Sequence, residues 1–349
     1  MNRRSLLAGA ATLAASPLAA PSLRAQGQGG GRYKPEYKIS VVGNRPIALS
    51  EAAFAWADLV NQRSEGRLNF KVYPGSSLVG GDQTRELLAI RQGVIDGAVF
   101  STINISPQVR EMNIFSLPFL MPNHAAFDAL VGGEVGADLF RVLGQRDVEP
   151  LAWGENGFRE ISNSKRPIRT PADLRGLKIR FAAGAIFSEI YTGLGANPVQ
   201  MSFADLQPAL STGAVDGQEN PINLFLGFRM DSLAQKHLTI WNYCADAGIV
   251  TIGRQVMSTF EPRDREIVVE SAREAARAGI AAARKGLGVV DADRSSLEEL
   301  GRRGVEVVDL SPAEKRAFAQ ATRPVFDKWA GTVGAELVRK AESAISRTA

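Results

Sequence analysis

The chain has 349 residues, 45% of them hydrophobic, and its formal net charge is +4. Residues 1–26 hold three arginines and no acid, so the remainder carries only +1 (4 − 3). With no basic run interleaved with aromatic residues, this charge excludes typical nucleic-acid binding. The single cysteine, Cys244, excludes an internal disulfide, so stability must come from a substantial core. Two isolated histidines, His124 and His237, supply neither a clustered metal site nor a recognisable catalytic pair, and we expect no metal and no cofactor.

The N-terminal segment is typical of an export signal. Arg3 and Arg4 precede an apolar, alanine-rich run of about fifteen residues, and Ala25 stands at a suitable cleavage point. The run is shorter than the roughly 20 residues that span a bilayer, which argues against a membrane anchor. The paired arginines resemble a twin-arginine signal, although the residues around them match that pattern only in part. We predict that 1–26 is cleaved, that 27–36 is a flexible leader, and that the protein is periplasmic.

From residue 37 onward, short apolar strands alternate with amphipathic helices. Such a βαβαβ order implies a parallel sheet, because parallel strands need a crossover connection. Ser50 is the expected N-cap of the first helix. The pattern predicts strands at 38–42, 68–73, 94–100, 149–153 and 159–162, and helices at 50–63, 84–92 and 125–143.

The same order repeats in the second half of the chain. Thr170 and Ser202 each begin a capping sequence that predicts a helix start, and Gly213 predicts a helix end. About 310 residues is more than one core usually serves, so two α/β domains joined by several crossings are expected. The remaining predicted elements are strands at 177–181, 214–218 and 247–253, and helices at 263–285, 292–301 and from 312 onward.

One arginine in this half stands out as a candidate anion-binding residue. In the strand at 177–181, Leu177, Ile179 and Phe181 alternate with Arg180, which therefore faces away from the core near a strand end. Ligands of open α/β sheets bind at the carboxyl ends of strands, and a planar guanidinium matches a carboxylate with two parallel hydrogen bonds. We therefore predict that Arg180 binds an anion.

Several short phrases extend this interpretation, because they occur together in one order and at characteristic spacing. They are Tyr73 to Leu78, Gly93 to Asp96, Leu117 to Leu120, Gly157 to Ile168, Asp173 to Arg180 and Val215 to Pro221. In these phrases the chain resembles the substrate-binding proteins of TRAP transporters, the DctP-type family. The resemblance covers nearly all of the sequence after the export signal.

The resemblance implies an α/β fold of two periplasmic-binding-protein-like lobes, with hinge-connected mixed or parallel sheets and long helices. Lobe I is expected to comprise 37–156 plus 246–285, and lobe II 157–245 plus 286–349. The implied function is capture of an organic acid through an arginine–carboxylate contact and delivery to an ion-gradient-driven membrane permease. A protein of this kind performs no chemistry, and we expect a monomer.

The resemblance also implies roles for particular residues. Arg180 matches the arginine that pairs with the ligand's carboxylate, and Arg159 matches a second arginine directed at the same group. Asn220 matches an amide that holds the carboxylate, and Phe203 matches an aromatic residue against the ligand's body. Independently, the two arginines lie on predicted strands that we expect to be neighbours, so both could reach one anion.

Other interpretations of these residues stay open. One arginine could instead pair with a structural acid such as Glu155 or Asp205. Glu219 is a further candidate ligand contact, although a residue before a proline also serves to satisfy backbone groups.

Three more residues are candidates because of their position. Ser101 and Asn104 follow the third strand, where family members vary their ligand contacts, and the alternative is ordinary loop solvation. Trp153 is a candidate for the cleft wall, although a buried strand tryptophan is more often part of the core.

Two rival functions use the same carboxylate contact. An exported lyase or isomerase could hold its substrate with Arg180 and use Asp96, Asp216 or Glu219 as the base. A ligand-sensing input protein would pass the signal to a partner instead of a permease.

Overall fold

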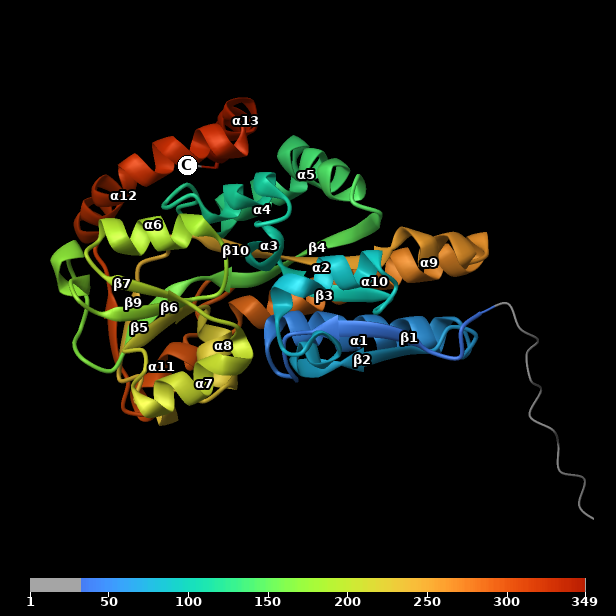
Figure 1. The fold of residues 1–349 in the computed structure, drawn as a ribbon, viewed down its shortest axis with the longest axis horizontal. Helices are drawn as coiled ribbons and strands as arrows, with labels where there is room; N and C mark the ends of the chain where they lie inside the picture. Colours follow the sequence, from blue (N-terminus) through green and yellow to red (C-terminus); the bar gives the residue numbers. More distant parts are fainter. Residues whose placement is uncertain (1–32, 349) are drawn as a thin grey trace, which may run out of the picture. The chain divides into compact units, whose positions relative to one another are not determined.

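The computed structural model describes residues 33–348. The predicted export signal at 1–26, and the predicted leader up to residue 32, lie outside this part. None of the described helices is long and apolar enough to cross a membrane. The described chain builds two β-sheets, called sheet A and sheet B, each accompanied by helices (Figure 1).

Sheet A has five strands in the order β2-β1-β3-β10-β4. The predicted parallel arrangement is confirmed for β1, which runs parallel to both β2 and β3. β10 arrives from far along the chain and runs antiparallel to β3 and β4, so the sheet is mixed. The strands are β1 (Tyr37–Val41), β2 (Phe70–Tyr73), β3 (Gly97–Ser101), β4 (Val148–Phe158) and β10 (Ala245–Gly253).

Two packed helices cover sheet A. α1 contacts β1 to β4 and also packs along α10, where the indole Nε1 of Trp56 donates a 3.0 Å hydrogen bond to the Val268 carbonyl. The Ser50 cap prediction is wrong: Ile47 is the N-cap, because the Ser50 hydroxyl donates inward to the Gly43 carbonyl at 2.7 Å. The helices of this part are α1 (Ala48–Arg63), α2 (Glu86–Arg91), α3 (Thr102–Ile105), α4 (His124–Gly132), α5 (Glu134–Gly144), α9 (Arg254–Thr259) and α10 (Pro262–Arg284).

The helix predicted at 125–143 is two helices, α4 and α5. Gly133 separates them with an extended conformation, φ −102° and ψ −163°, which no residue inside an α-helix adopts. Short 3₁₀ segments complete the connections on both sheets. They are η1 (Pro74–Val79), η2 (Gln83–Arg85), η3 (Arg110–Ser116), η4 (Pro171–Leu174) and η5 (Met230–Leu233).

Sheet B has six strands in the order β11-β9-β5-β8-β6-β7 and lies on the left in Figure 1, with β1 to β3 of sheet A on the right. β5 runs antiparallel to β8 and β9, whereas β6 runs parallel to β7 and β8. The strands are β5 (Glu160–Asn163), β6 (Lys178–Phe181), β7 (Asn197–Gln200), β8 (Gly217–Asn220), β9 (His237–Ile240) and β11 (Glu306–Asp309).

Among the helices that accompany sheet B, the predicted capping residues begin and end α7 and begin α12. The Ser202 hydroxyl accepts from the Asp205 amide at the start of α7, and Gly213 ends the helix in the left-handed region, φ 71°. Ser311 and Glu314 form the capping box that begins α12. The helices are α6 (Ala185–Gly193), α7 (Phe203–Thr212), α8 (Ile222–Gly227), α11 (Ser295–Arg302), α12 (Pro312–Val333) and α13 (Ala335–Ser346).

The chain passes between the sheets three times, after β4, after β9 and after α10. α12 packs against α6 and η3, and α13 packs against α4 and α5, so the C-terminal helices contact elements of both parts. The lobe boundaries given above therefore stay a proposal.

Glu160 links two of these crossings. Its Oε2 accepts hydrogen bonds from the backbone amides of Trp241 at 2.8 Å and Asn242 at 3.1 Å. Glu160 therefore connects the crossing after β4 with the crossing after β9. Burial raises the pKa of this carboxyl group to about 7, and the more distant charges of Lys315 and Asp309 act in opposite directions.

We expect Glu160→Gln to remove a pH dependence of folding. Because the folded-state pKa is raised, the stabilising contribution of Glu160 is complete below its ordinary pKa of 4.5 and is lost as pH rises through about 7. Glutamine keeps an acceptor oxygen for both amides and does not titrate. Relative to the wild type, the variant should therefore gain roughly 2–3 kcal/mol between pH 5 and pH 8 in urea unfolding. An equal stability difference at both pH values would contradict this.

Candidate functional site

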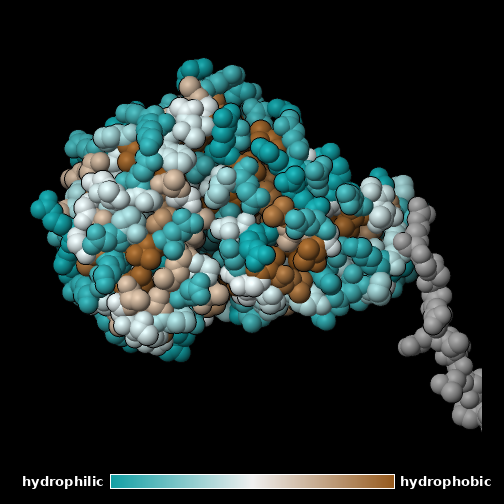
Figure 2. Space-filling view, viewed as in Figure 1, coloured by the Kyte–Doolittle hydropathy of each residue, from teal (hydrophilic) through white to brown (hydrophobic). Residues whose placement is uncertain are grey.

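A cavity with a volume of about 30 Å³ lies between elements of the two sheets. The visible face of the molecule is mainly hydrophilic, with apolar side chains in separate patches (Figure 2). Polar residues that we predicted from sequence line the cavity together with Phe203: Ser101, Asn104, Arg159, Arg180 and Asn220. The lining residues that we did not predict are Val42, Leu49, Gln83, Asn156, Ala182 and Leu224.

Arg180 on β6 is the residue that distinguishes this cavity from larger hollows elsewhere. Its side chain is fully buried, and its Nε donates to the Met201 carbonyl at 3.0 Å. Nη1 and Nη2 are buried and have no hydrogen-bond partner among the described residues. Burial lowers the pKa of Arg180 to about 10, so the guanidinium is still charged at neutral pH. The ring of Phe203 lies 5.8 Å from the guanidinium carbon, at cation–π distance.

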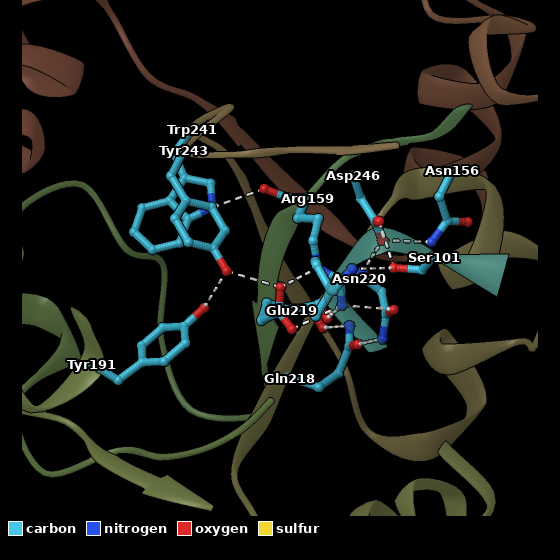
Figure 3. Close-up of polar contacts among 12 residues, drawn as sticks. Ser101, Asn156, Arg159, Tyr191, Gln218, Glu219, Asn220, Trp241, Tyr243 and Asp246 are labelled. Atoms are coloured by element: carbon cyan, nitrogen blue, oxygen red, sulfur yellow. Dashed lines mark hydrogen bonds and ion pairs between the residues drawn. The ribbon is translucent and has the colours of Figure 1, made fainter. Parts of the chain in front are cut away.

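Arg159, between β4 and β5, is by contrast fully engaged with acids of the protein. Its Nε pairs with Glu219 Oε2, Nη2 donates to Glu219 Oε1 at 2.8 Å, and Nη1 donates to Asp246 Oδ2 at 2.7 Å (Figure 3). Burial alone would lower the pKa of Arg159, but the two carboxylates outweigh it and hold the pKa well above its ordinary value. Arg159 therefore pairs with structural acids, the alternative stated above, but its partners are Glu219 and Asp246. Glu155, which was named as a possible partner, pairs with Arg284 instead.

The expectation that the two arginines lie on neighbouring strands is wrong. β8 lies between β5 and β6 and pairs with both of them. Its residues Glu219 and Asn220 consequently reach Arg159 from the side, and Asn220 Oδ1 accepts from Arg159 Nη2 at 3.0 Å. The other end of the Asn220 amide donates to Gln218 Oε1. A strand before Asn220 was predicted, but its position in the sheet depends on pairing between distant segments.

A chain of aromatic hydroxyls supports Glu219 from behind. Tyr243 donates to Glu219 Oε2 at 2.9 Å, and Tyr191 donates to the Tyr243 hydroxyl at 3.3 Å (Figure 3). Burial raises the pKa of both tyrosines well above the ordinary value, which keeps them protonated donors. The indole of Trp241 donates to the Arg159 carbonyl at 3.1 Å. None of these supporting residues carried a signal in the sequence.

Asp246 on β10 accepts hydrogen bonds from two residues of sheet A, Ser101 and Asn156. It accepts from the Ser101 hydroxyl at 2.5 Å and from Asn156 Nδ2 at 2.7 Å, in addition to Arg159. Burial raises the pKa of Asp246, and the charge of Arg159 opposes that rise. Ser101 therefore lines the cavity but directs its hydroxyl hydrogen to Asp246. Asn156 was missed, although it immediately precedes the Gly157-Phe158-Arg159 phrase.

Two predicted candidates lie outside the cavity lining. Glu219 is completely buried behind Arg159. Trp153 stacks on Phe140 with ring centroids 4.5 Å apart and also contacts Phe115, which belongs to the hydrophobic core. This is the core alternative that we left open for the tryptophan.

The pairing of Arg159 leads to a prediction about stability. Glu219→Ala leaves the buried guanidinium without its main partner and should cost about 3–5 kcal/mol in chemical denaturation. Tyr243→Phe is the matched control, since it removes one hydrogen bond from the same carboxylate and should cost roughly 1 kcal/mol. Equal losses in the two variants would show that Glu219 does not act by balancing the charge of Arg159.

Comparison with known proteins identifies the family. The model of bacterial extracellular solute-binding protein family 7 matches residues 43–332. The chain is 30% identical over 315 residues to the 2,3-diketo-L-gulonate-binding periplasmic protein of Escherichia coli, covering 90% of this chain and 88% of that protein. It is 28% identical over 309 residues to the C4-dicarboxylate-binding periplasmic protein of Rhodobacter capsulatus, covering 88% and 90% of the two chains.

Solved structures agree. A TRAP periplasmic solute-binding protein from Ralstonia eutropha, with bound (S)-2-hydroxy-2-methyl-3-oxobutanoate, is 52% identical with a TM-score of 0.88, covering 90% of this chain and all of that one. A second, from Polaromonas and bound to D-erythronate, is 28% identical with a TM-score of 0.80, covering 88% and 98% of the chains. These likenesses confirm the two-lobed α/β fold. The chain belongs to bacterial extracellular solute-binding protein family 7, the DctP family of TRAP periplasmic solute-binding proteins.

Proposed function

We propose that this protein captures a small organic acid in the cavity between its sheets, binds the carboxylate with Arg180, and delivers the acid to a TRAP-type permease driven by an ion gradient. The single observation that supports this most is the unsatisfied guanidinium of Arg180. A buried donor without a partner costs about 1–3 kcal/mol, and more when it is charged. A carboxylate ligand that accepts from Nη1 and Nη2 removes this cost and adds a bidentate ion pair.

The charges around the cavity favour a monocarboxylate. Arg159 is neutralised by Glu219 and Asp246, so Arg180 is the one lining cation without a hydrogen-bonded acid among the described residues. A second carboxylate on the ligand would therefore lack a countercharge and would be costly to bury. In support, the relative from Ralstonia eutropha has a branched monocarboxylate bound.

The shape of the cavity favours a small ligand with an apolar part. Val42 and Leu49 from the sheet A side and Leu224 from α8 give it apolar walls. Its volume is only about 30 Å³, well below the roughly 300–1,000 Å³ of typical small-molecule sites, so an acid can be bound only if the walls move apart. We propose that the lobes open to admit the acid and close around it, because Nη1 and Nη2 of Arg180 and Oδ1 of Asn156 are buried here.

The remaining parts of the proposal follow from the family and the sequence. A cleaved signal, similar to a twin-arginine signal, would export the chain, and the protein would act as a monomer. The permease would recognise the loaded form, since binding proteins of this kind carry ligands without changing them.

The enzymatic alternative has little support from the geometry. Asp96 pairs with Lys34 and Asp216 pairs with Lys165, and neither carboxylate lines the cavity. Glu219 is bound by Arg159, so none of the three candidate bases has a free carboxylate near a ligand held by Arg180. A general base must lie within hydrogen-bond reach of the proton that it removes.

Arg180→Met is the test of the binding role. We expect calorimetry to show loss of most affinity for any acid that a thermal-shift screen identifies, and Arg180→Lys should lose nearly as much, because a lysine cannot form a two-pronged contact. Without ligand, Arg180→Met should be as stable as the wild type or more stable, by up to about 4 kcal/mol, because an unpaired buried charge is removed.

Arg175→Met is the matched control, since Arg175 is an exposed arginine of the same lobe outside the cavity. It should bind with wild-type affinity. Unchanged affinity in Arg180→Met would contradict the proposed role of Arg180, and turnover of a bound acid would favour the enzymatic alternative.

A further inference from the structure

Asn156 occupies an irregular position in sheet A. Along the β4–β10 pair, Ala247 lies opposite Glu155 and Asp246 lies opposite Gly157, with a register shift between them. Asn156 is therefore the extra residue of a β-bulge, a feature that re-aims a side chain. Its carbonyl, freed from the ladder, accepts a 2.6 Å hydrogen bond from Asn223 Nδ2 at the start of α8. Elements of both sheets thus fix the backbone of this residue.

The side-chain amide of Asn156 has one fixed orientation. Its Nδ2 donates to Asp246 Oδ2, which also accepts from Arg159, while Ser101 donates to the other carboxylate oxygen. A carboxylate accepts hydrogen bonds and does not donate them, so the amide nitrogen must face Asp246. The amide oxygen then points away from it (Figure 3). Flipping the amide would set two acceptors against each other.

The side-chain oxygen of Asn156, Oδ1, has no hydrogen-bond partner among the described residues. Asn156 lines the cavity, its side chain is only 3% exposed, and Oδ1 is a buried acceptor without a donor among the described residues. Among the buried atoms of the described residues that line this cavity, Nη1 and Nη2 of Arg180 are also unsatisfied, and those are donors. The cavity therefore offers donors for a carboxylate at one place and an acceptor at another. A carboxylic acid that also carries a hydroxyl group satisfies both.

We propose that Asn156 Oδ1 is a hydroxyl-binding position, and that the protein selects small 2-hydroxy acids over the 2-oxo and unsubstituted acids of the same carbon skeleton. The inference rests on the proposed function, because it takes the carboxylate to be held by Arg180. A 2-oxo acid has no donor and would set its ketone oxygen against Oδ1. An unsubstituted acid would leave Oδ1 unsatisfied. Sites built to bond a polar group discriminate strongly against analogues that lack it.

The test uses calorimetry on the mature protein with three matched ligands: 2-hydroxy-3-methylbutanoate, 2-oxo-3-methylbutanoate and 3-methylbutanoate. Lactate, pyruvate and propionate form a second, smaller set. In the wild type, the hydroxy acid of at least one set should bind at least about tenfold more tightly than its two counterparts.

Two variants separate the role of Oδ1 from general support of the site. Asn156→Ala removes the acceptor and also one donor to Asp246. Ser101→Ala removes a different donor to Asp246 but leaves Asn156 Oδ1 in place. The preference for the hydroxy acid should fall to within about threefold in Asn156→Ala and should persist in Ser101→Ala, whatever the overall affinity.

The outcomes distinguish this inference from the proposed function. Equal wild-type affinities within each set, or an unchanged preference in Asn156→Ala, would overturn the hydroxyl-binding role while leaving acid capture intact. Binding of other carboxylates, but of neither hydroxy acid, would overturn the inference in the same way. If no carboxylate of a broad screen binds, the proposed function fails together with it.

Discussion

The paired charges of Arg159 organise the centre of this molecule. Its guanidinium binds Glu219 of sheet B and Asp246 of sheet A at the point where the chain passes from one sheet to the other. Burying a guanidinium is costly unless its donors are satisfied, and for Arg159 both sheets supply the acceptors. The interaction therefore fixes how the central strands meet.

The selectivity that we propose for the cavity depends on the different roles of its two arginines. Arg159 is paired with acids of the protein, whereas Nη1 and Nη2 of Arg180 have no hydrogen-bond partner among the described residues, and we propose that they bind the ligand. Asp246 also orients the side-chain amide of Asn156, because its carboxylate accepts a hydrogen bond from Asn156 Nδ2. The Arg159–Asp246 ion pair thus helps to orient Asn156 Oδ1, the acceptor that we propose for the ligand's hydroxyl group.

Features encoded locally could be predicted from the sequence. The start of α7 at Ser202 and its end at Gly213 depend on neighbouring residues only, and both predictions are confirmed. The position of β8 between the two arginine-bearing segments depends on long-range pairing, which local patterns do not specify. The bulge at Asn156 depends on the register of β4 against β10, a strand almost a hundred residues later in the chain. Arg180 was predicted from the alternation in its strand, and Phe203 and Asn220 through the family resemblance, and all three line the cavity. The pairing of Arg159 with Glu219 and Asp246 could be seen only in the three-dimensional contacts.

The most direct measurement is a crystal structure of the mature protein with a small 2-hydroxy acid bound. The account predicts that both carboxylate oxygens lie within hydrogen-bond distance of Arg180 Nη1 and Nη2, while Arg159 keeps its contacts to Glu219 and Asp246. A carboxylate bound to Arg159 instead, with Glu219 or Asp246 displaced and Arg180 still unpaired, would contradict the central claim.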